Sequence, residues 1–451
     1  MAPRPADAVA LPTVALRDRL AQGALRPTEV ARTCLDRIRA AEPQVRAWAW
    51  LDEDHVLAQA ERLEAQRRSG VPVGPLYGLP VGVKDIVDTR GIPTCNGTPT
   101  DAGRVPDRDA WVIARLRAAG AVMMGKTVTT EMAYMHPGPT TNPANPAHTP
   151  GGSSQGSAAA VAAGMVPLGI GTQTGGSVIR PAAFCGVVGF KPTFGRIPRT
   201  GILMQSPTLD TVGVFARDVA GAALLAEALW GHDPADRATE PLPPPRLVET
   251  ALSRAPVAPT FARVHLPAED AAHPDMRDAM AELVADLGDL CFETGLPAAF
   301  DRAAEWREVI NLAEMARYYD APARRAGEAL SPVLRAAMDR GRAITARDYL
   351  AALDWPAILA AGIDEILERA DAILCPAAPG PAPQGLDSTG SAIFNGLWTM
   401  TGHPAVTLPL FTAGNGLPMG VQLVGRRGDD ARLLRSANWL AARMAEAQPE
   451  G

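Results

Sequence analysis

Cysteine is scarce in this chain of 451 residues, and its pattern argues against a disulfide framework. No two cysteines form a C-x-x-C pair, and the five are scattered over Cys34, Cys95, Cys185, Cys291 and Cys375. An odd and sparse set in a long chain indicates free thiols in a reducing compartment. The seven histidines also lack the spacing of metal ligands. We therefore expect a cytoplasmic protein that holds no metal and no cofactor.

Long apolar runs and basic clusters are missing as well. The best candidate for a membrane span, residues 158–171, is too short and contains Gly164 and Pro167. Residues 9–11 are cut off by Pro12, so we expect no secretory signal. The 43 basic and 49 acidic residues leave a net charge of −6, without the basic stripe of a nucleic-acid-binding protein. The sequence thus predicts neither a membrane nor a nucleic acid as partner.

The chain does have the composition of a globular protein with a large core, 47% hydrophobic and 20% charged. Apolar residues at helical spacing, such as Val30, Cys34 and Ile38, predict helices over residues 13–66 and again over 109–120. Runs typical of buried strands occur at 81–84, 121–125, 372–375, 405–410 and 420–424. Strands mixed with helices predict an α/β sheet covered by helices.

Changes in composition and predicted secondary structure divide the chain into four segments. Residues 1–70 form an N-terminal helical segment, and 71–240 carry the glycine-rich motifs described below. The run PLPPP begins a mainly helical segment, 241–370, that is most strongly helical over residues 273–370. Residues 371–451 turn back to strands and are expected to rejoin the core sheet.

The first motif, GAVMMGKT at 120–127, matches the phosphate-loop pattern letter for letter. A phosphate loop needs a strand before its first glycine and a helix after its lysine. Here a helix precedes Gly120, and the four intervening residues form an apolar strand whose N–H groups belong to a sheet. We interpret the match as a coincidence and Lys126 as a strand-end lysine, with a nucleotide-binding protein as the remote alternative.

The second motif, GSSQG at 152–156, matches the G-x-S-x-G nucleophile elbow. That elbow needs a strand directly before it, but a long polar loop over 137–157 surrounds the motif. It also needs an acid and then a histidine later in the chain, where His403 is the only histidine beyond residue 273. The elbow is therefore a weak interpretation, and a helix beginning at Ser157 is expected instead.

The third motif is GIGTQTGGS at 169–177, a buried strand that runs into a glycine-rich turn and presents the hydroxyl of Ser177. Glycines permit unusual backbone angles and the close approach of a substrate. They also let successive N–H groups point to one spot, which is what an oxyanion requires. Alone, this turn only suggests a catalytic serine.

Taken in series, these pieces resemble the amidase-signature family. LPVGVKD at 79–85 is similar to the family's catalytic-lysine motif, 150–164 and 169–177 to its signature, and 186–193, 209–213 and 402–422 to later family segments. The resemblance covers most of the chain and is weakest over 243–370. It implies a single large α/β domain with a twisted mixed β-sheet covered by α-helices, and it makes 71–240 the catalytic core.

The resemblance also implies a Ser-Ser-Lys triad. Lys84 takes the place of the family's lysine, Ser153 that of the serine after an unusual cis peptide bond, and Ser177 that of the nucleophile. The separation of 24 residues between positions 153 and 177 favours Ser153 over Ser154. The implied oxyanion hole consists of the backbone N–H groups of Thr174, Gly175, Gly176 and Ser177.

Such a triad requires a neutral lysine, although a free lysine has a pKa near 10.4. The apolar run 81–83 suggests that Lys84 is buried, which favours the neutral amine. Asp85 would oppose this if it pointed the same way. Adjacent side chains on a strand point to opposite faces, so we expect Asp85 to point away from Lys84.

Three residues depart from the family pattern near the triad. Gln173 stands where the family often has Asp, and Ile179 where it often has Arg, with Arg180 one step later. Gln155 replaces a common Gly. No catalytic group is lost, but the departures predict a different hydrogen-bond shell around the nucleophile, so the substrate of a relative does not transfer to this chain.

The expected activity is an amidase that hydrolyses a carboxamide or urea-like C–N bond of a small molecule, releasing ammonia or an amine through an acyl-enzyme. An amidotransferase-type subunit that supplies ammonia to a partner is the alternative, and a homodimer remains open. Cys95 is a conceivable nucleophile but lacks a histidine partner nearby. Residues predicted to contact substrate, each with core packing as the competing interpretation, are Met132, Tyr134, Gln205 and Trp398.

Overall fold

One mixed sheet of eleven strands organises the molecule. The computed structural model describes residues 9–447. In spatial order the strands are β1 (Trp48–Leu51), β3 (Val122–Thr127), β2 (Pro80–Lys84), β4 (Leu168–Gln173), β6 (Thr211–Ala216), β5 (Val188–Lys191), β10 (Ala405–Thr412), β11 (Pro418–Val424), β9 (Ala372–Pro376), β7 (Phe261–His265) and β8 (Cys291–Gly295). Strand β2 runs parallel to β3 and β4, whereas β4 and β6 are antiparallel. The predicted α/β class with a mixed sheet is confirmed.

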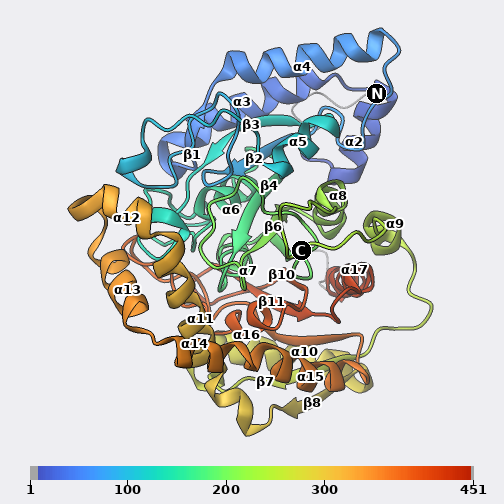
Figure 1. The fold of residues 1–451 in the computed structure, drawn as a ribbon. Coiled ribbons are helices and arrows are strands. Elements are labelled where there is room, and N and C mark those ends of the chain that lie inside the picture. Colours follow the sequence, from blue (N-terminus) through green and yellow to red (C-terminus); the bar gives the residue numbers. More distant parts are fainter. Residues whose placement is uncertain (1–8, 448–451) are drawn as a thin grey trace.

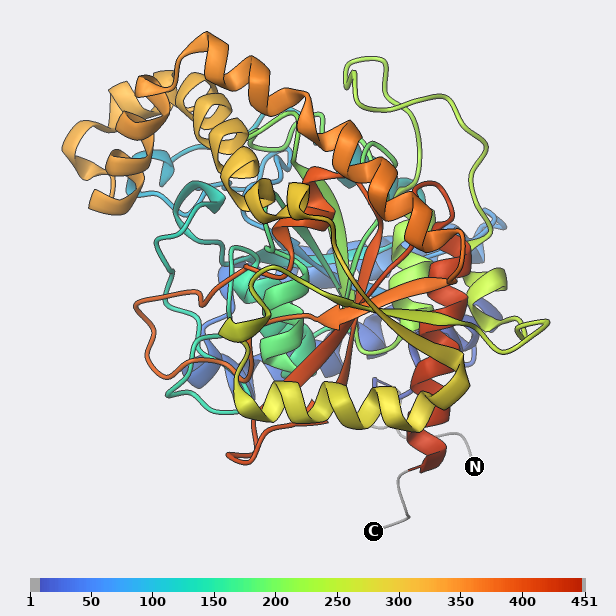
Figure 2. The same ribbon diagram turned by 90° about the horizontal axis from the view of Figure 1, so that it is seen from below.

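Helices surround this sheet on all sides of the view in Figure 2, with the strands running through the middle and α10 below them. In chain order the α-helices are α2 (Thr13–Gln22), α3 (Pro27–Val45), α4 (Glu53–Arg68), α5 (Trp111–Ala118), α6 (Gln155–Ala162), α7 (Ile179–Cys185), α8 (Val219–Leu229), α9 (Leu247–Leu252), α10 (Pro274–Leu287), α11 (Ala303–Tyr318), α12 (Asp320–Ala326), α13 (Pro332–Ala343), α14 (Ala346–Leu353), α15 (Trp355–Leu367), α16 (Gly396–Met400) and α17 (Asp430–Ala447). None of these described helices is long and apolar enough to cross a membrane.

All four sequence segments contribute strands to the one sheet. The N-terminal segment, of which residues 1–8 lie outside the described part, supplies β1, and 241–370 supplies β7 and β8. These three strands were not expected, nor were β5 and β6. β1 has four residues and β8 is a half-exposed edge strand, so neither shows the continuous apolar run of a buried strand. The strands expected at 81–84, 121–125, 372–375, 405–410 and 420–424 are all present.

Four helices, α11 to α14, form a separate layer at the left of Figure 1. We call residues 303–353 the helical cap. Its apolar side packs into a second, smaller hydrophobic cluster made of Met132, Leu312, Met315, Tyr319, Ala326, Leu330, Leu334, Ala337 and Met338. The hydroxyl of Tyr319 donates to the carbonyl oxygen of Met132 over 2.6 Å. The cap is therefore docked on the short segment that follows β3.

Candidate active site

Lys84 ends strand β2 and is fully buried. Its Nζ donates to Oγ of Ser153 over 2.7 Å and to Oγ1 of Thr172 over 2.9 Å. Burial lowers the pKa of Lys84 to about 7, while the charge of Asp210 opposes the shift. Removing an ammonium from water disfavours its charged form, so a sizeable fraction of neutral amine is available near neutral pH.

Asp85 points away from Lys84, as the alternation of a strand predicts. Its Oδ1 lies 3.3 Å from Nζ of Lys126, which is itself fully buried and donates to Oγ1 of Thr94 over 2.7 Å. Lys126 belongs to β3, which pairs with β2 on one side and β1 on the other. The backbone of residues 122–127 is thus committed to the sheet, which agrees with the interpretation of the phosphate-loop match as a coincidence.

The two adjacent serines at 153 and 154 have different surroundings. The peptide bond between Gly152 and Ser153 is cis, as the family resemblance implies. Ser153 faces Lys84, whereas Oγ of Ser154 donates to the carbonyl oxygen of Thr172 and accepts from its N–H, both over 3.3 Å. Ser154 therefore ties its loop to β4, and Ser153 is the serine in contact with the lysine.

The turn over residues 174–177 follows β4 directly and presents its backbone to open space. Within the described chain, none of the four N–H groups of this turn donates to a protein acceptor. Side chains hold the turn instead. Oγ1 of Thr174 donates to Oδ1 of Asp210 over 2.6 Å, and Oγ1 of Thr399 donates to the carbonyl oxygen of Gly175 over 2.7 Å. A β-carbon at Gly176 would lie 2.4 Å from Oδ1 of Asn395, so only glycine fits there.

Ser177 is the last residue of this turn. Its hydroxyl makes no hydrogen bond to another described residue, and the side chain contributes to the wall of a cavity. The turn therefore combines a serine hydroxyl and four backbone N–H groups that make no hydrogen bond within the described residues. We call the ends of β2 and β4, the loop 151–154 and the turn 174–177 the catalytic floor.

Gln173, and Arg180 directly after the Ile179 departure, have clear structural roles. Oε1 of Gln173 accepts from the N–H groups of Val178 and Ile179 over 2.9 and 3.0 Å, satisfying donors at the start of α7. Its Nε2 donates to Oγ1 of Thr399 over 2.9 Å. Arg180 donates through Nε and Nη2 to the carbonyl oxygen of Gly152, over 3.2 and 2.6 Å. Both side chains therefore brace the catalytic floor, Gln173 in place of the usual Asp and Arg180 one position after the usual Arg.

Gln155, the third departure, has a similar structural role. Its Oε1 accepts from the N–H of Gly138 over 2.7 Å. The side chain lies at the first residue of α6, so this helix begins at Gln155, two residues before the Ser157 start that the sequence suggested. The bond ties the long loop 137–154 to the helix behind it.

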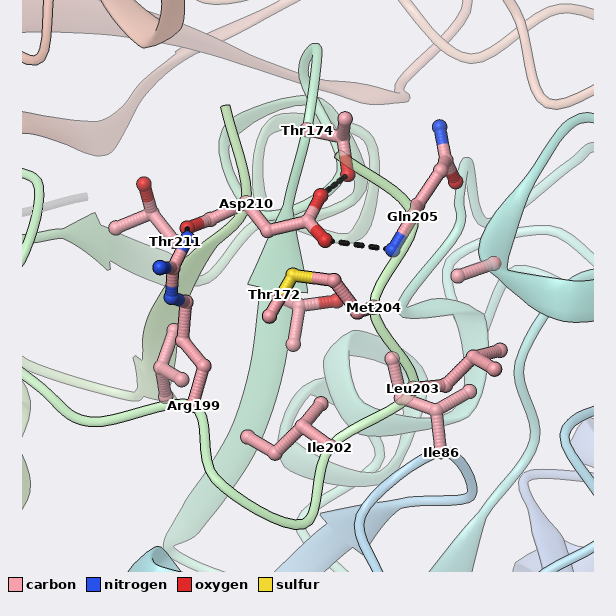
Figure 3. Close-up of a pocket in the computed structure, with 12 residues that line it drawn as sticks. Ile86, Thr172, Thr174, Arg199, Ile202, Leu203, Met204, Gln205, Asp210 and Thr211 are labelled. Atoms are coloured by element: carbon pink, nitrogen blue, oxygen red, sulfur yellow. Dashed lines mark hydrogen bonds between the residues drawn. The ribbon is translucent and has the colours of Figure 1, made fainter. Parts of the chain in front are cut away.

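The cavity in front of Ser177 has a volume of about 520 Å³, within the usual range for small-molecule sites. The catalytic floor forms one part of its wall and helix α11 of the helical cap forms another. A much smaller cavity, of about 10 Å³, lies behind the turn and is lined by Thr172, Thr174 and Asp210 among others (Figure 3). That space is comparable to a single water molecule and cannot hold a substrate.

The structure separates the four residues predicted to contact substrate into two pairs. Tyr134 and Gln205 line the large cavity. Met132 and Trp398 are 1% and 0% exposed and do not line it. Met132 serves as the docking point of the helical cap, and Trp398 is buried in the main core. The core-packing interpretation holds for these two, because an apolar side chain near a site pattern can equally face the interior.

Several residues of the site were not foreseen. Thr172 contacts Lys84, and the parallel pairing of Val83 with Ile170 would have placed it there had the register been known. Asp210 accepts from Thr174 and from the N–H groups of Gln205 and Ser206, over 2.8 and 3.0 Å (Figure 3 shows the first two bonds). Burial raises the pKa of Asp210, and these hydrogen bonds counteract the shift. Asp210 therefore couples the glycine-rich turn to the loop before β6.

The helical cap reaches this same loop through α11. Nε2 of Gln205 donates to Oδ1 of Asn311 over 2.8 Å. Glu314 accepts from the hydroxyls of Ser206 and Thr208 and, over 2.7 Å, from Tyr349. One polar face of α11 thus holds the loop that carries Asp210.

Two other residues weighed from the sequence lie in different surroundings. Burial raises the pKa of the Cys95 thiol, and its Sγ donates to the carbonyl oxygen of Ala102, so the thiolate is disfavoured. Burial lowers the pKa of His403 to about 4, and its ring nitrogens contact Thr401 and Asp364. No group of three or more His, Cys, Asp or Glu side chains within residues 9–447 could hold a metal ion.

Comparisons with known proteins agree with this geometry. The profile of the family described as Amidase matches residues 29–434. A glutamyl-tRNA(Gln) amidotransferase subunit from Chloroflexus aggregans is 34% identical over 460 residues, 92% of this chain and 93% of the relative. Native peptide amidase from Stenotrophomonas maltophilia superposes with a TM-score of 0.83 at 29% identity, covering 95% of this chain and 96% of that one. A structure from a vestigial protein complex, described as revealing the origins of an s-triazine catabolic enzyme, reaches a TM-score of 0.89 at 28% identity, covering 96% and 98%.

Proposed function

This chain belongs to the amidase family, whose members act on C–N amide bonds, and we propose that Ser177, Ser153 and Lys84 are its catalytic triad. The observation that carries the proposal is the contact of a fully buried lysine, with its pKa lowered to about 7, to the hydroxyl of Ser153. A serine hydroxyl is a weak nucleophile until a base removes its proton. A neutral Lys84 is such a base at neutral pH.

In the proposed first step, Oγ of Ser177 attacks the carbonyl carbon of the amide. Its proton passes to Ser153 while the proton of Ser153 passes to the neutral Nζ of Lys84, which becomes an ammonium. The carbonyl π electrons move to oxygen and create an oxyanion. The N–H groups of residues 174–177, which lack protein acceptors within the described chain, are proposed to receive it.

In the second step the C–N bond breaks and the leaving nitrogen takes a proton back from Lys84 through Ser153. Ammonia or an amine departs and the acyl group stays on Ser177 as an ester. Water then attacks this ester with the same two groups as its base, and collapse of the new oxyanion releases the carboxylic acid and restores Ser177. No metal or cofactor takes part in this proposal.

The substrate is proposed to be a small amide or urea-like molecule. A cavity of about 520 Å³ has room for such a ligand. Tyr134 and Gln205 are proposed to contact it, because both line the cavity and Oε1 of Gln205 has no hydrogen-bond partner within the described chain. We further propose that the protein works in the reducing cytoplasm, since its five cysteines are all free.

An amidotransferase-type subunit is the second candidate, favoured by the 34% identity to a protein of that kind over nearly the whole chain. Such a protein would pass ammonia to a partner. It is expected to co-purify with its partners when the tagged chain is isolated from its own cells. A chain that isolates alone and hydrolyses free amides at full rate contradicts this second candidate.

The test of the proposed function is hydrolysis of a panel of aliphatic, aromatic and ureido amides by the purified chain, followed by ammonia or amine release. Ser177→Ala is expected to lower kcat by about 10⁴-fold or more, as for other serine nucleophiles. Ser253→Ala, an exposed serine at the end of α9, is the matched control and should change nothing. Full activity in Ser177→Ala contradicts the proposal.

A further inference from the structure

Arg307 projects from α11 of the helical cap toward the glycine-rich turn and lines the large cavity. A β-carbon on Gly175 would lie 3.4 Å from its Nη1, and one on Gly396 would lie 2.7 Å from its Nε. The guanidinium therefore occupies the space between the turn and the start of α16. Glycine at position 396 is what leaves room for it.

This guanidinium has no acceptor of its own. Within residues 9–447, neither a hydrogen-bond acceptor nor a carboxylate is paired with Arg307, although a guanidinium offers five N–H donors. The neighbouring Glu308 is engaged by Nη2 of Arg340, and Glu305 is paired with Arg302 over 2.7 Å. Burial lowers the pKa of Arg307, and the charge of Glu308 only partly offsets that effect. Arg307 is partly buried and borders the cavity, so its N–H donors are available to an anionic ligand there.

A second cation on the same wall strengthens the positive field. Arg180 is 3% exposed and lines the cavity, but its N–H groups go to the carbonyl oxygens of Gly152 and Gly390, not to a carboxylate. The two acidic residues on the cavity wall are Asp301, which is exposed, and Glu308, which is already paired. The wall near Ser177 is therefore cationic without a matching acid.

We infer that the cavity selects amides that also carry a carboxylate, and that Arg307 binds this carboxylate. Guanidinium and carboxylate form paired N–H···O bonds, which give both strength and orientation. Gly175 and Ser177 are two residues apart, so their Cα atoms are separated by about 7 Å or less. The guanidinium next to Gly175 and the hydroxyl of Ser177 can therefore be reached by the two ends of one short molecule. A monoamide of a short dicarboxylic acid meets this condition. The inference rests on the proposed function, because it names the substrate class of that site.

The test compares amides that differ only in the second carboxyl group. Succinamate and glutaramate are assayed against their neutral methyl esters and butyramide, by ammonia release. The native protein is expected to prefer the anions in kcat/KM. In Arg307→Gln the anions should lose about 10²-fold, because hydrogen bonds between two charged partners are stronger than neutral ones, while the neutral amides change by less than about threefold. Arg307→Lys should keep part of the preference, because it keeps the charge but not the paired geometry.

Arg302→Gln is the matched control, since it removes an exposed arginine that is paired with Glu305 just before α11. It should leave both substrate classes unchanged. A separate readout needs no turnover: succinate should bind the native chain and Arg302→Gln, measured by calorimetry, and bind Arg307→Gln at least about 30-fold more weakly.

Three results would overturn the inference. The first is a native protein with a higher kcat/KM for the neutral amides. The second is an equal loss of kcat/KM for anions and neutral amides in Arg307→Gln. The third is an affinity for succinate that is unchanged in Arg307→Gln. The equal loss would make Arg307 a stabiliser of the oxyanion or of the fold. Labelling of Ser177 by a fluorophosphonate probe separates failure of the substrate class from failure of the proposed function. If Ser177 is labelled but the protein shows no preference for anions, the substrate class is refuted and the proposed function stands.

Discussion

The catalytic floor and the helical cap line the same cavity but are built in different ways. In the floor, the groups that matter are backbone N–H groups and short hydroxyls fixed by the ends of β2 and β4, with Lys84 beneath them. The cap contributes polar side chains of one helix, Arg307 and Asn311 of α11, to the cavity wall. The floor depends on main-chain geometry, and the cap depends on which side chains a single helix carries.

This difference suggests a division of labour. Groups that handle the proton and the oxyanion must be held to within fractions of an ångström, which rigid strand ends and a braced turn provide. Groups that choose among substrates can be exchanged one by one without disturbing the sheet. Changes in the floor should therefore affect every substrate, whereas changes in the cap should affect some substrates more than others.

The sharpest test of this division within the floor compares two adjacent serines. Ser153→Ala should lower kcat by about 10³-fold or more for every amide, because it cuts the proposed proton path to Lys84. Ser154→Ala removes only two bonds of 3.3 Å to Thr172 and should cost about tenfold or less. Steady-state kinetics on one amide measures both. Equal losses in the two variants would mean that the loop, and not the hydroxyl of Ser153, is what matters.

The pH dependence of the floor is the next largest effect. The proposed mechanism requires a neutral Lys84, and burial lowers its pKa to about 7. Below that pH the ammonium dominates, so kcat/KM should fall about tenfold per pH unit, and above it the rate should level off. The profile between about pH 5.5 and about pH 8.5 measures this, with recovery at about pH 8 as the control for denaturation. A flat profile would contradict a neutral lysine as the base.

The lowered pKa of Lys84 also makes the free energy of unfolding depend on pH. The folded-state pKa of Lys84 lies below its ordinary value of 10.5, so the unfolded chain binds more protons between about pH 7 and that value. The contribution of Lys84 to the free energy of unfolding therefore increases with pH across this window. Below about pH 7 its destabilising contribution is complete.

The cap gives the smallest predicted effect. Glu314→Gln weakens the bonds to Ser206 and Thr208 that hold the loop before β6, so the free energy of unfolding should fall by about 1–3 kcal/mol and KM should rise severalfold. Glu305→Gln, an exposed acid on the same helix, is the control and should be neutral. Thermal unfolding and kinetics measure the two effects. An unchanged KM would show that α11 does not position the loop that contributes Gln205 to the cavity.

The floor could be predicted from the sequence because its parts are local. The apolar strand before Lys84, the two serines at 153 and 154, and the glycine-rich turn each have a recognisable short pattern, and the family resemblance supplied their roles. The strand β4 lies where the sequence predicts it, and the cis peptide bond before Ser153 lies where the family resemblance implies it. The sequence did not reveal the register between β2 and β4, so Thr172 was missed as the second hydrogen-bond partner of Lys84.

The cap could not be predicted in the same way, because its contribution depends on how α11 docks. Positions 307, 311 and 314 lie on one face of a helix, at spacings of four and three, and carry Arg, Asn and Glu. This polar stripe was a signal that the face meets something polar, but the sequence does not say what. Met132 illustrates the same limit: it was predicted to contact substrate, but its side chain is buried under the cap and does not line the cavity.

The most direct test of the triad is the rate at which a fluorophosphonate probe labels the protein, with the site located by peptide mass spectrometry. The proposed mechanism predicts a single label on Ser177 and a rate that rises with pH through about 7, since the same base activates the serine. Lys84→Ala should slow labelling by about 10²-fold or more, and Ser177→Ala should abolish it. A label on another serine, or an unchanged rate in Lys84→Ala, would contradict the assignment of Ser177 as nucleophile and Lys84 as its base.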